Sequence, residues 1–475
     1  MTRTKRLLWL SLSLLLTALV RTGWLALFPT DPLGPVDAEG FHLLAVNVLK
    51  GRGFAIGWEA PFCPTAVRTP LYPLFLMGIY ALLGRLPQAV VLVQVLLEVL
   101  TAAWVMGLAR QIAGPHPFRS MITAGLLYAC NGTTQRYTGY LLSEALLLPL
   151  ITAALCITVR FLKRPLRRRA LGSGVLWGLT LLTKPNVQYL VVAIGGLMLL
   201  WGWRDERADT RARPSLKRGM VFWGALAICV LPWIVRNRVV LGRWMFSTAF
   251  EENVARVSVV ATLAEQAGVD AEPWSETWEY LYRRFSATHG LPKTSLSCEM
   301  LDERRRQVAQ AAKRFVLQHL GLYLRVHLRG VVKSLLDPGH RLWYHVITQR
   351  DWSATGVVPD IWDRMAWSLT RGAVGDALRA FWTERAAHIP FTAAMIWWSL
   401  VIGRTAVWFL AMRGIGGLRS SPICGLLMLG VVAYHLLLPG PIAYDRFYAP
   451  AVPVVSVLVA DGLQGIISSA TTLLD

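Results

Sequence analysis

The chain opens on a membrane-length apolar run, LLWLSLSLLLTALVRTGWLALF (residues 7–28), which follows the basic segment Met1-Thr2-Arg3-Thr4-Lys5-Arg6. A helix of about 20 apolar residues crosses the hydrocarbon core of a bilayer. A basic segment before an apolar run is also typical of a secretory signal. Here, however, the run is longer than the apolar core of such a signal, and no small-residue cleavage site follows it. We therefore expect a retained first membrane span.

Similar apolar runs recur along the chain. Of its 475 residues, 54% are hydrophobic and only 16% are charged, and the mean hydropathy is +0.44. This composition excludes a soluble domain and predicts an all-α polytopic membrane protein with about ten transmembrane helices. The expected spans are 7–28, 88–109, 119–136, 139–160, 170–184, 187–203, 219–236, 390–412, 421–438 and 449–467.

The net charge of +21 comes from basic residues that cluster between the expected spans. These clusters lack the interleaved aromatic residues of a nucleic-acid platform, so no nucleic-acid partner is expected. They all fall on one side of the membrane in the ten-span arrangement, as the positive-inside rule requires. We therefore expect a multi-pass protein of the cell (inner or plasma) membrane with both termini cytoplasmic. The clusters are 1–6, 110–119, 160–169, 204–218 and 413–420.

The expected topology divides the chain into an N-terminal membrane module (1–236), a small, mainly helical extracytoplasmic domain (237–389) and C-terminal transmembrane helices (390–475). The first outer loop, 29–87, ends in the apolar stretch 71–83, which is too short to span and is expected to lie at the outer surface. Residues 315–336 are amphipathic and carry several cations. An interfacial helix is favoured there, because a span would bury those charges at high cost.

Carboxylates provide the candidate catalytic residues. Asp37 and Glu39 lie in the first polar stretch after the first span, and Glu144 lies at the outer end of an otherwise apolar span. Asp37 and Glu39 would share a face on a strand but not on a helix. A carboxylate near a dry, apolar boundary tends to have a raised pKa and can accept a proton from an acceptor hydroxyl. The alternative for Asp37 is an ordinary solvated loop acid.

Five cations are expected to face the same side of the membrane as these acids: Arg68, Lys184, Arg236, Arg238 and Arg446. Each of them alone is also consistent with a boundary anchor. Together they would suit an anionic lipid headgroup, because guanidinium and ammonium groups bind phosphate. Tyr72 and Tyr448 accompany two of these cations and are candidates for positioning the substrate, or are aromatic-belt residues.

Two of the six cysteines, Cys63 and Cys298, fall in polar outer segments, whereas the other four fall in apolar runs and are expected to be packing residues. A disulfide between Cys63 and Cys298 would form if that side of the membrane is oxidising. The sequence leaves open whether the two thiols pair or stay free.

Several short motifs occur in an order that resembles a known family. They are Asp37-x-x-x-Phe41, Gly51-Arg52-Gly53-Phe54, Arg68-Thr69-Pro70-Leu71-Tyr72-Pro73, Ser143-Glu144, Leu182-Thr183-Lys184-Pro185, Pro232-Trp233-Ile234-Val235-Arg236-Asn237 and Arg446-Phe447-Tyr448. The set resembles the GT-C integral membrane glycosyltransferases, in the branch of the aminoarabinose transferase, the protein mannosyltransferases and the lipopolysaccharide-core glycosyltransferases. The mannosyltransferases carry an adjacent Asp-Glu pair, whereas Ala38 intervenes here, so the sugar stays open.

The resemblance implies an inverting transfer of a sugar from a polyprenyl-phosphate donor to a lipid, glycan or protein acceptor at the outer face, with Asp37 as the base. We expect Glu39 or Glu144 to assist Asp37, and the cations to hold the donor phosphate. Besides donor and acceptor, membrane lipids are the expected partners. No metal or organic cofactor is expected, although some GT-C relatives need a divalent cation.

Two other classes of protein remain as alternatives. A polytopic transporter or lipid flippase would also have many spans and charged outer loops, but it predicts inverted-repeat symmetry and polar residues near mid-membrane. The sequence shows neither clearly. A non-catalytic assembly subunit would tolerate the loss of Asp37.

Overall fold

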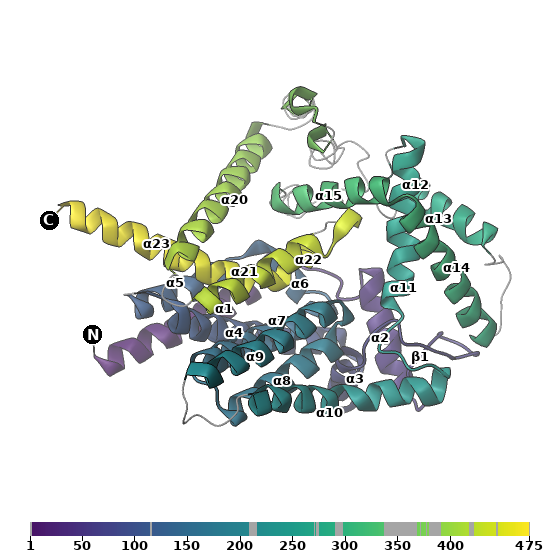
Figure 1. Ribbon diagram of the computed structural model, residues 1–475, viewed down its shortest axis with the longest axis horizontal. Helices are drawn as coiled ribbons and strands as arrows, with labels where there is room; N and C mark the ends of the chain where they lie inside the picture. The colour runs from purple at the N-terminus through teal and green to yellow at the C-terminus, as the bar shows by residue number, and fades with distance from the viewer. Residues whose placement is uncertain are drawn as a thin grey trace.

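The computed structural model describes residues 2–114, 116–208, 216–269, 271, 275–289, 298–336, 368–370, 372–376, 378–379, 391–417, 422–442 and 445–474. Over these residues the chain is almost entirely helical (Figure 1). The first half contains α1 (Arg3–Leu27), α2 (Val36–Leu49), α3 (Leu71–Leu83), α4 (Pro87–Ile112), α5 (Pro117–Ala129), α6 (Gly132–Thr138), α7 (Glu144–Lys163), α8 (Arg167–Thr183), η1 (Pro185–Val187), α9 (Gln188–Ala208) and α10 (Leu216–Leu241). The second half contains α11 (Ala249–Asn253), η2 (Val254–Ser258), α12 (Val259–Ala267), α13 (Glu276–Thr288), α14 (Cys298–Gln318), α15 (Leu320–Leu336), α20 (Phe391–Gly417), α21 (Pro422–Leu437), η4 (Gly440–Ile442), α22 (Asp445–Tyr448), η5 (Ala449–Ala451) and α23 (Val452–Leu474).

Five segments are long and apolar enough to cross a membrane: Arg3–Leu27, Pro87–Ile112, Glu144–Lys163, Leu216–Leu241 and Arg446–Ser469. Shorter apolar helices accompany them, among them α3 and α21. The multi-pass helical architecture is therefore confirmed, but with five clear spans instead of about ten. The expected span 119–136 illustrates the difference. The helix is interrupted at Asn131, because the Asn131 side chain accepts a hydrogen bond from the Thr134 amide and caps a new helix, α6.

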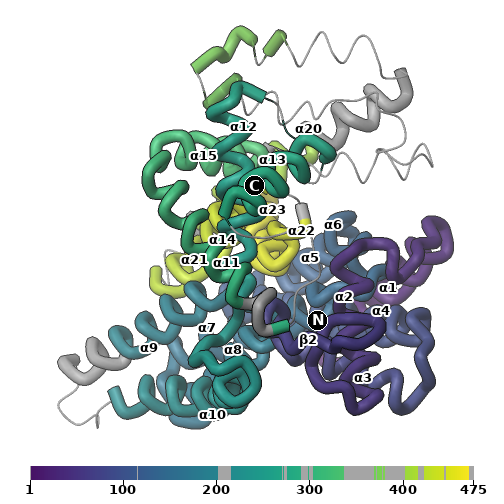
Figure 2. Tube along the Cα trace, turned by 90° about the vertical axis from the view of Figure 1, so that its right-hand side faces the viewer, coloured from purple at the N-terminus to yellow at the C-terminus, as the bar shows by residue number. Residues whose placement is uncertain are grey.

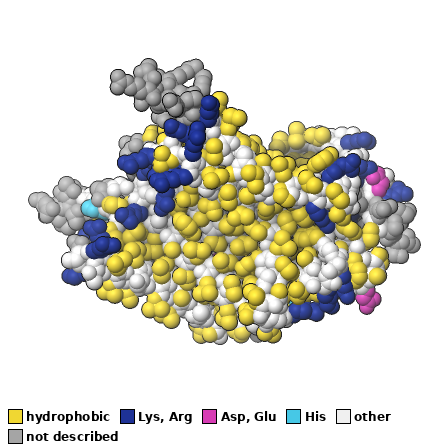
Figure 3. All heavy atoms as spheres, turned by 90° about the horizontal axis from the view of Figure 1, so that it is seen from below, with side chains coloured by type: hydrophobic (Ala, Val, Ile, Leu, Met, Phe, Trp, Pro, Cys, Tyr) yellow, Lys and Arg dark blue, Asp and Glu magenta, His cyan; other side chains and the backbone are white. Residues whose placement is uncertain are grey.

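The surface supports a membrane location. Viewed from below, a broad band of hydrophobic side chains covers the middle of the molecule, and Lys and Arg gather toward its two ends (Figure 3). A soluble protein rarely exposes a continuous apolar surface of this kind. The arrangement matches a bilayer-facing band between two basic rims. The side of the membrane on which each end lies stays a prediction.

Close helix packing in the membrane bundle depends on small residues. A Cβ added at Gly174 of α8 would overlap the Phe222 carbonyl of α10, and one added at Gly414 of α20 would overlap the Leu458 carbonyl of α23. Membrane helices approach closely where glycine leaves the backbone bare. The largest buried core lies among these helices and includes the fully buried Trp177.

The loop between α2 and α3 contains the single sheet of the described residues, an antiparallel pair of β1 (Ala55–Ile56) and β2 (Cys63–Pro64). The buried Asn47 side chain of α2 holds it by donating to the Ala55 carbonyl at 2.8 Å and to the Gly57 carbonyl at 3.0 Å. The all-α expectation needs this correction. Two-residue strands are too short to leave an alternating pattern in the sequence.

Helices α12–α15 form a second body above the membrane helices, at the end of the molecule away from the N-terminus (Figures 1 and 2). The expected amphipathic helix 315–336 is divided between α14 and α15, which break at His319. Arg404 of α20 donates to the Ser334 carbonyl at 2.9 Å, and so holds the end of α15. Parts of the expected domain 237–389 lie outside the described residues, namely 270, 272–274, 290–297, 337–367, 371, 377 and 380–389. The three-part division stays a prediction.

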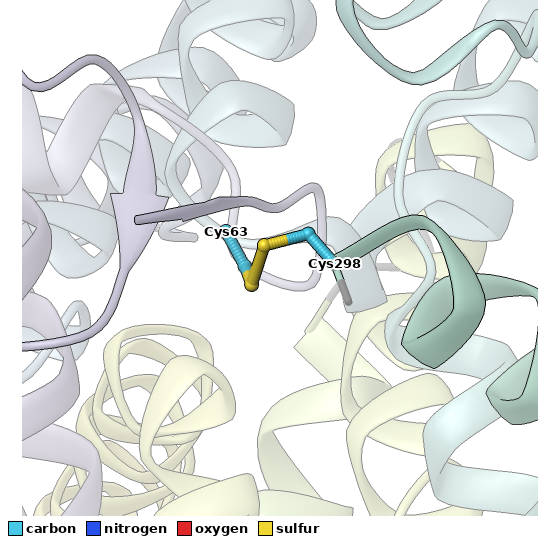
Figure 4. The surroundings of a disulfide bond; sticks show 2 residues. All are labelled: Cys63 and Cys298. Carbon is cyan, nitrogen blue, oxygen red and sulfur yellow. A yellow bond between two sulfur atoms is a disulfide. The ribbon is translucent and has the colours of Figure 1, made fainter. Parts of the chain in front are cut away.

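A disulfide joins the first loop to the second body. Cys63 of β2 and Cys298 at the start of α14 are bonded (Figure 4); their Cα atoms are 5.2 Å apart, and their sequence separation is 235. The pairing that the sequence left open is therefore present. It fastens the loop that follows α2 to a helix from the opposite half of the chain.

Candidate active site

Asp37 lies in the first turn of α2, where an acidic side chain complements the positive end of the helix dipole. The buried face of this helix fixes its position: Ala38 is fully buried, and the Phe41 ring packs edge-on against Tyr72 of α3 at 5.0 Å. The Asp37 side chain is left 43% exposed. It is therefore anchored through its helix but open to a ligand.

Arg68 reaches Asp37 from the end of a strap, which we define as residues 64–68. Its Nη2 donates to Asp37 Oδ1 at 2.8 Å, and its guanidinium lies 4.2 Å from the centre of the Phe41 ring. Gly40 permits this approach, since a Cβ there would lie 2.7 Å from Arg68 Nη2. A larger residue at position 40 would displace the guanidinium.

Arg236 supports the strap from α10. Its guanidinium donates to the Thr65 and Phe54 carbonyls, both at 2.9 Å. The Ser247 hydroxyl donates to the Val67 carbonyl at 2.9 Å. Arg236 was expected among the phosphate-binding cations, but a phosphate would have to compete with these bonds. The arrangement favours a role in positioning Arg68.

Arg446 forms the centre of the site by bridging two carboxylates. Its Nη1 donates to Asp37 Oδ2 at 2.5 Å, and its Nη2 donates to Glu144 Oε2 at 3.1 Å. Glu144 begins α7 and is fully buried, and Lys184 at the C-terminal end of α8 also donates to its carboxylate. Arg446 and Lys184 keep 18% and 12% of their side chains exposed. Five segments that are distant in sequence thus meet in one cluster: Asp37, Arg68, Glu144, Lys184 and Arg446.

The cluster has one more cation than carboxylates. Partial burial raises the pKa of Asp37, but Arg446 and Arg68 outweigh this effect and hold that pKa well below its ordinary value. Asp37 is therefore ionised at neutral pH. The expectation of a raised pKa was wrong, because the sequence did not show that two arginines converge on this carboxylate. The surplus positive charge suits an anionic ligand.

Two expected site residues lie outside the cluster. Glu39 is exposed and accepts from Trp58 Nε1 at 3.3 Å. It is two positions from Asp37 on a helix, so the two carboxylates point to different faces. Arg238 is exposed and donates to the Gly242 carbonyl at 2.7 Å, beyond the end of α10.

The two expected positioning tyrosines are buried. The Tyr72 hydroxyl donates to Gln94 Oε1 at 2.7 Å, and the Tyr448 ring lies 4.3 Å from the Arg404 guanidinium. Both contacts are those of packing residues. Sequence reasoning missed Gln94, although a polar residue inside an apolar span was a signal for it. It also missed Phe447, whose ring lies 5.6 Å from Lys184 Nζ.

Metal ligands are not assembled at this site. Within the described ranges, no three His, Cys, Asp or Glu side chains come close enough together to hold a metal ion. Both carboxylates of the cluster are instead paired with cations.

Comparison with known proteins gives one family match. Residues 67–234 match the family described as dolichyl-phosphate-mannose-protein mannosyltransferase. The matched segment includes Arg68, Glu144 and Lys184 of the cluster, whereas Asp37 and Arg446 lie outside it. No curated protein matches the chain.

Solved structures give a likeness of fold. The oligosaccharyltransferase AglB from Archaeoglobus fulgidus, solved with an inhibitory peptide and a dolichol-phosphate, has a TM-score of 0.51 at 14% identity, over 98% of this chain and 50% of that one. The apo form of the A. fulgidus oligosaccharyltransferase gives 0.51 at 15% identity, over 98% and 51%. The chain therefore spans about half the length of that enzyme.

A third structure, ArnT from Cupriavidus metallidurans bound to undecaprenyl phosphate, has a TM-score of 0.40 at 13% identity, over 98% of this chain and 78% of that one. At 14–15% identity, the likeness to the oligosaccharyltransferase shows a shared fold. The chain thus has the fold of the GT-C membrane glycosyltransferases and carries, in residues 67–234, the sequence match to their protein mannosyltransferase branch.

Proposed function

We propose that this chain transfers a sugar from a polyprenyl-phosphate donor to an acceptor at the extracytoplasmic face of the membrane, with inversion at the anomeric carbon. The observation that carries the proposal is the Arg446 bridge between Asp37 and Glu144, at the end of a membrane bundle of the GT-C type. The bridge leaves a partly exposed carboxylate beside partly exposed cations. A sugar attached to a lipid phosphate needs both.

The two carboxylates have different roles in this proposal. Asp37 is 43% exposed and would face the reacting atoms, whereas Glu144 is fully buried and holds Arg446 and Lys184 in place. Glu144 is therefore a positioning residue. Arg68, Lys184 and Arg446 are the cations that would face the donor phosphate, since Arg236 and Arg238 are engaged with backbone carbonyls elsewhere.

Donor binding changes the state of Asp37. With both oxygens paired to arginine, Asp37 is a weak base. A lipid phosphate competes for the Arg68 guanidinium and for Nη1 of Arg446, while Glu144 keeps the rest of Arg446. As the arginines turn to the phosphate, the pKa of Asp37 rises toward its ordinary value. The base thus gains proton affinity when the donor is present.

The reaction then balances as one displacement. The acceptor oxygen or nitrogen attacks the anomeric carbon as its proton moves to Asp37, and the bond from that carbon to the phosphate oxygen breaks. The polyprenyl phosphate leaves with the electron pair, and its charge is held by the cations of the cluster. Such preorganised charges stabilise the leaving group in a site of low dielectric constant.

The test is turnover of Asp37→Asn, with Glu39→Gln as the matched control. Purified protein is incubated with a radiolabelled polyprenyl-phosphate sugar and cell-envelope extract, and the transferred label is counted. General-base help is typically worth about 10²–10⁴-fold, so Asp37→Asn is expected to lose that factor while Glu39→Gln transfers normally. Transfer by Asp37→Asn at the wild-type rate would show that Asp37 is not the base. A flippase would instead move the labelled lipid across vesicles without transferring the sugar.

A further inference from the structure

A second polar cavity lies beside the active-site strap. It has a volume of about 220 Å³ and is lined by residues of the strap and of α14. Cys63 and Cys298, which form the disulfide shown in Figure 4, also line it. Thr65 and Val67 of the strap also line it. The next residue along the chain is Arg68, which pairs with Asp37. A ligand in this cavity would therefore lie against the segment that positions the cluster.

The lining of this cavity is strongly charged, and part of that charge is already paired. Three of its charged side chains have partners outside the lining. The pairs are Glu251 with Arg243, Arg256 with Glu279, and Arg306 with Glu303. The first two pairs tie α11 and η2 to neighbouring segments, whereas the third lies within α14.

Two other charged side chains in the lining are free. Within the described part of the chain, Glu252 of α11 and Arg305 of α14 have neither an ion pair nor a hydrogen bond from their side chains. Arg305 is exposed and so is reachable from solvent. The cavity therefore presents one unpaired carboxylate and one unpaired guanidinium. Thr65 and Tyr282 also line it.

We infer that this cavity binds an anionic sugar unit of the acceptor. This inference rests on the proposed function and names the acceptor chemistry that it left open. A guanidinium binds a phosphate or carboxylate through two parallel hydrogen bonds, so Arg305 takes the anionic group. A carboxylate only accepts, so Glu252 takes the sugar hydroxyls. Neither group alone distinguishes an anionic sugar from a simple anion or a neutral sugar, but the pair does.

The size of the cavity agrees with a single unit. Pockets for drug-sized ligands have volumes of about 300–1,000 Å³, and this cavity is smaller. It accommodates one ring with its charged group, while the rest of the acceptor extends away from it. The acceptor hydroxyl would then reach Asp37 along the strap, past Arg68.

Binding of small probes to the full-length protein in detergent tests the site directly. The probes are glucose 1-phosphate, glucuronate, glucose and inorganic phosphate. Saturation-transfer NMR measures the binding of each. We expect both anionic sugars to bind more tightly than glucose or phosphate. Arg305→Ser is expected to weaken them at least about tenfold, because it removes two charge-assisted hydrogen bonds. Arg304→Ser is the matched control, because Arg304 is the preceding residue on α14 and does not line the cavity.

Glu252→Gln gives a second, independent variant. It should weaken both anionic sugars severalfold and leave the binding of inorganic phosphate unchanged, because Glu252 contacts hydroxyls and not the anion. Equal binding of glucose and glucose 1-phosphate, or equal affinities in Arg305→Ser and Arg304→Ser, would overturn the inference.

Transfer assays separate the failure of this inference from the failure of the proposed function. With envelope acceptor, Arg305→Ser should raise the acceptor KM and leave the donor KM unchanged, whereas Asp37→Asn should lower kcat. If Asp37→Asn loses transfer while Arg305→Ser behaves like Arg304→Ser, the cavity inference is wrong and the function stands. If wild-type protein transfers no sugar, the proposed function itself fails.

Discussion

Replacing Arg446 by Met tests the bridge on which the site depends. Arg446 donates three hydrogen bonds to two carboxylates, and the carboxylate of Glu144 is fully buried. Removing one partner of a buried ion pair typically costs about 3–5 kcal/mol, because the other charge stays buried without it. Lys184 still contacts Glu144, so we expect a loss near the lower limit, about 3 kcal/mol of the free energy of unfolding.

The measurement is chemical denaturation of the purified protein in detergent, together with the transfer assay. The triple variant Glu144→Gln/Lys184→Met/Arg446→Met should recover most of the lost stability, because Lys184 would otherwise be left without its carboxylate, but it should not recover transfer. Arg446→Lys keeps the charge without the planar fork that joins two carboxylates, and should lose about 10²-fold in transfer. Arg446→Met with a wild-type midpoint, or a triple variant no more stable than Arg446→Met, would refute the bridge.

Three further predictions concern the same cluster. Gly40→Ala should push the Arg68 guanidinium away from Asp37 and slow transfer about tenfold or more. Gly78→Ala is the control and should not slow transfer, because Gly78 is a helical glycine with open space around it. Steady-state transfer rates of the two variants decide this. Arg68→Gln should weaken binding of the donor phosphate about tenfold or more in a labelled-lipid binding assay and should lower the salt dependence of that binding; an unchanged affinity would remove Arg68 from the phosphate site. The pKa of Asp37 is lower in the folded protein than its unfolded value of about 3.9, so its ion pairs stabilise the protein above that pH, and this stabilisation is lost as the pH falls through the folded pKa. Denaturation midpoints should therefore show no contribution from Asp37 titration between about pH 5 and pH 8. A step in that range that disappears in Asp37→Asn would contradict the low pKa of Asp37.

Sequence patterns predicted what depends on local composition. The helix at 71–83 and the spans beginning near residues 7, 88 and 219 follow from runs of apolar residues, and the structure has them. The two-residue strands and the break at Asn131 did not follow, because each depends on one or two side-chain hydrogen bonds. A hydropathy pattern does not record such bonds.

The sequence predicted which residues form the candidate site better than it predicted what each of them does. Burying a charged side chain at the apolar end of a span costs free energy, and this cost pointed to Glu144, Lys184 and Arg446 as functional residues. These three residues contact one another in the structure. The same argument could not tell a cation in the cluster from one, such as Arg236, that holds the strap. Ion pairs between segments that lie hundreds of residues apart in sequence depend on the tertiary structure. The lowered pKa of Asp37 follows from them alone.

The Arg446 bridge also affects how the protein is made. Its partners lie 409 residues earlier, at Asp37, and 302 residues earlier, at Glu144. A ribosome therefore threads most of the helices into the membrane before the last member of the cluster exists. An unfinished or prematurely terminated polypeptide can insert into the bilayer, yet it lacks the arginine that joins the two carboxylates. Under the proposed function, lipid-linked sugar, which is costly for a cell to produce, would thereby be protected from wasteful cleavage by partial chains.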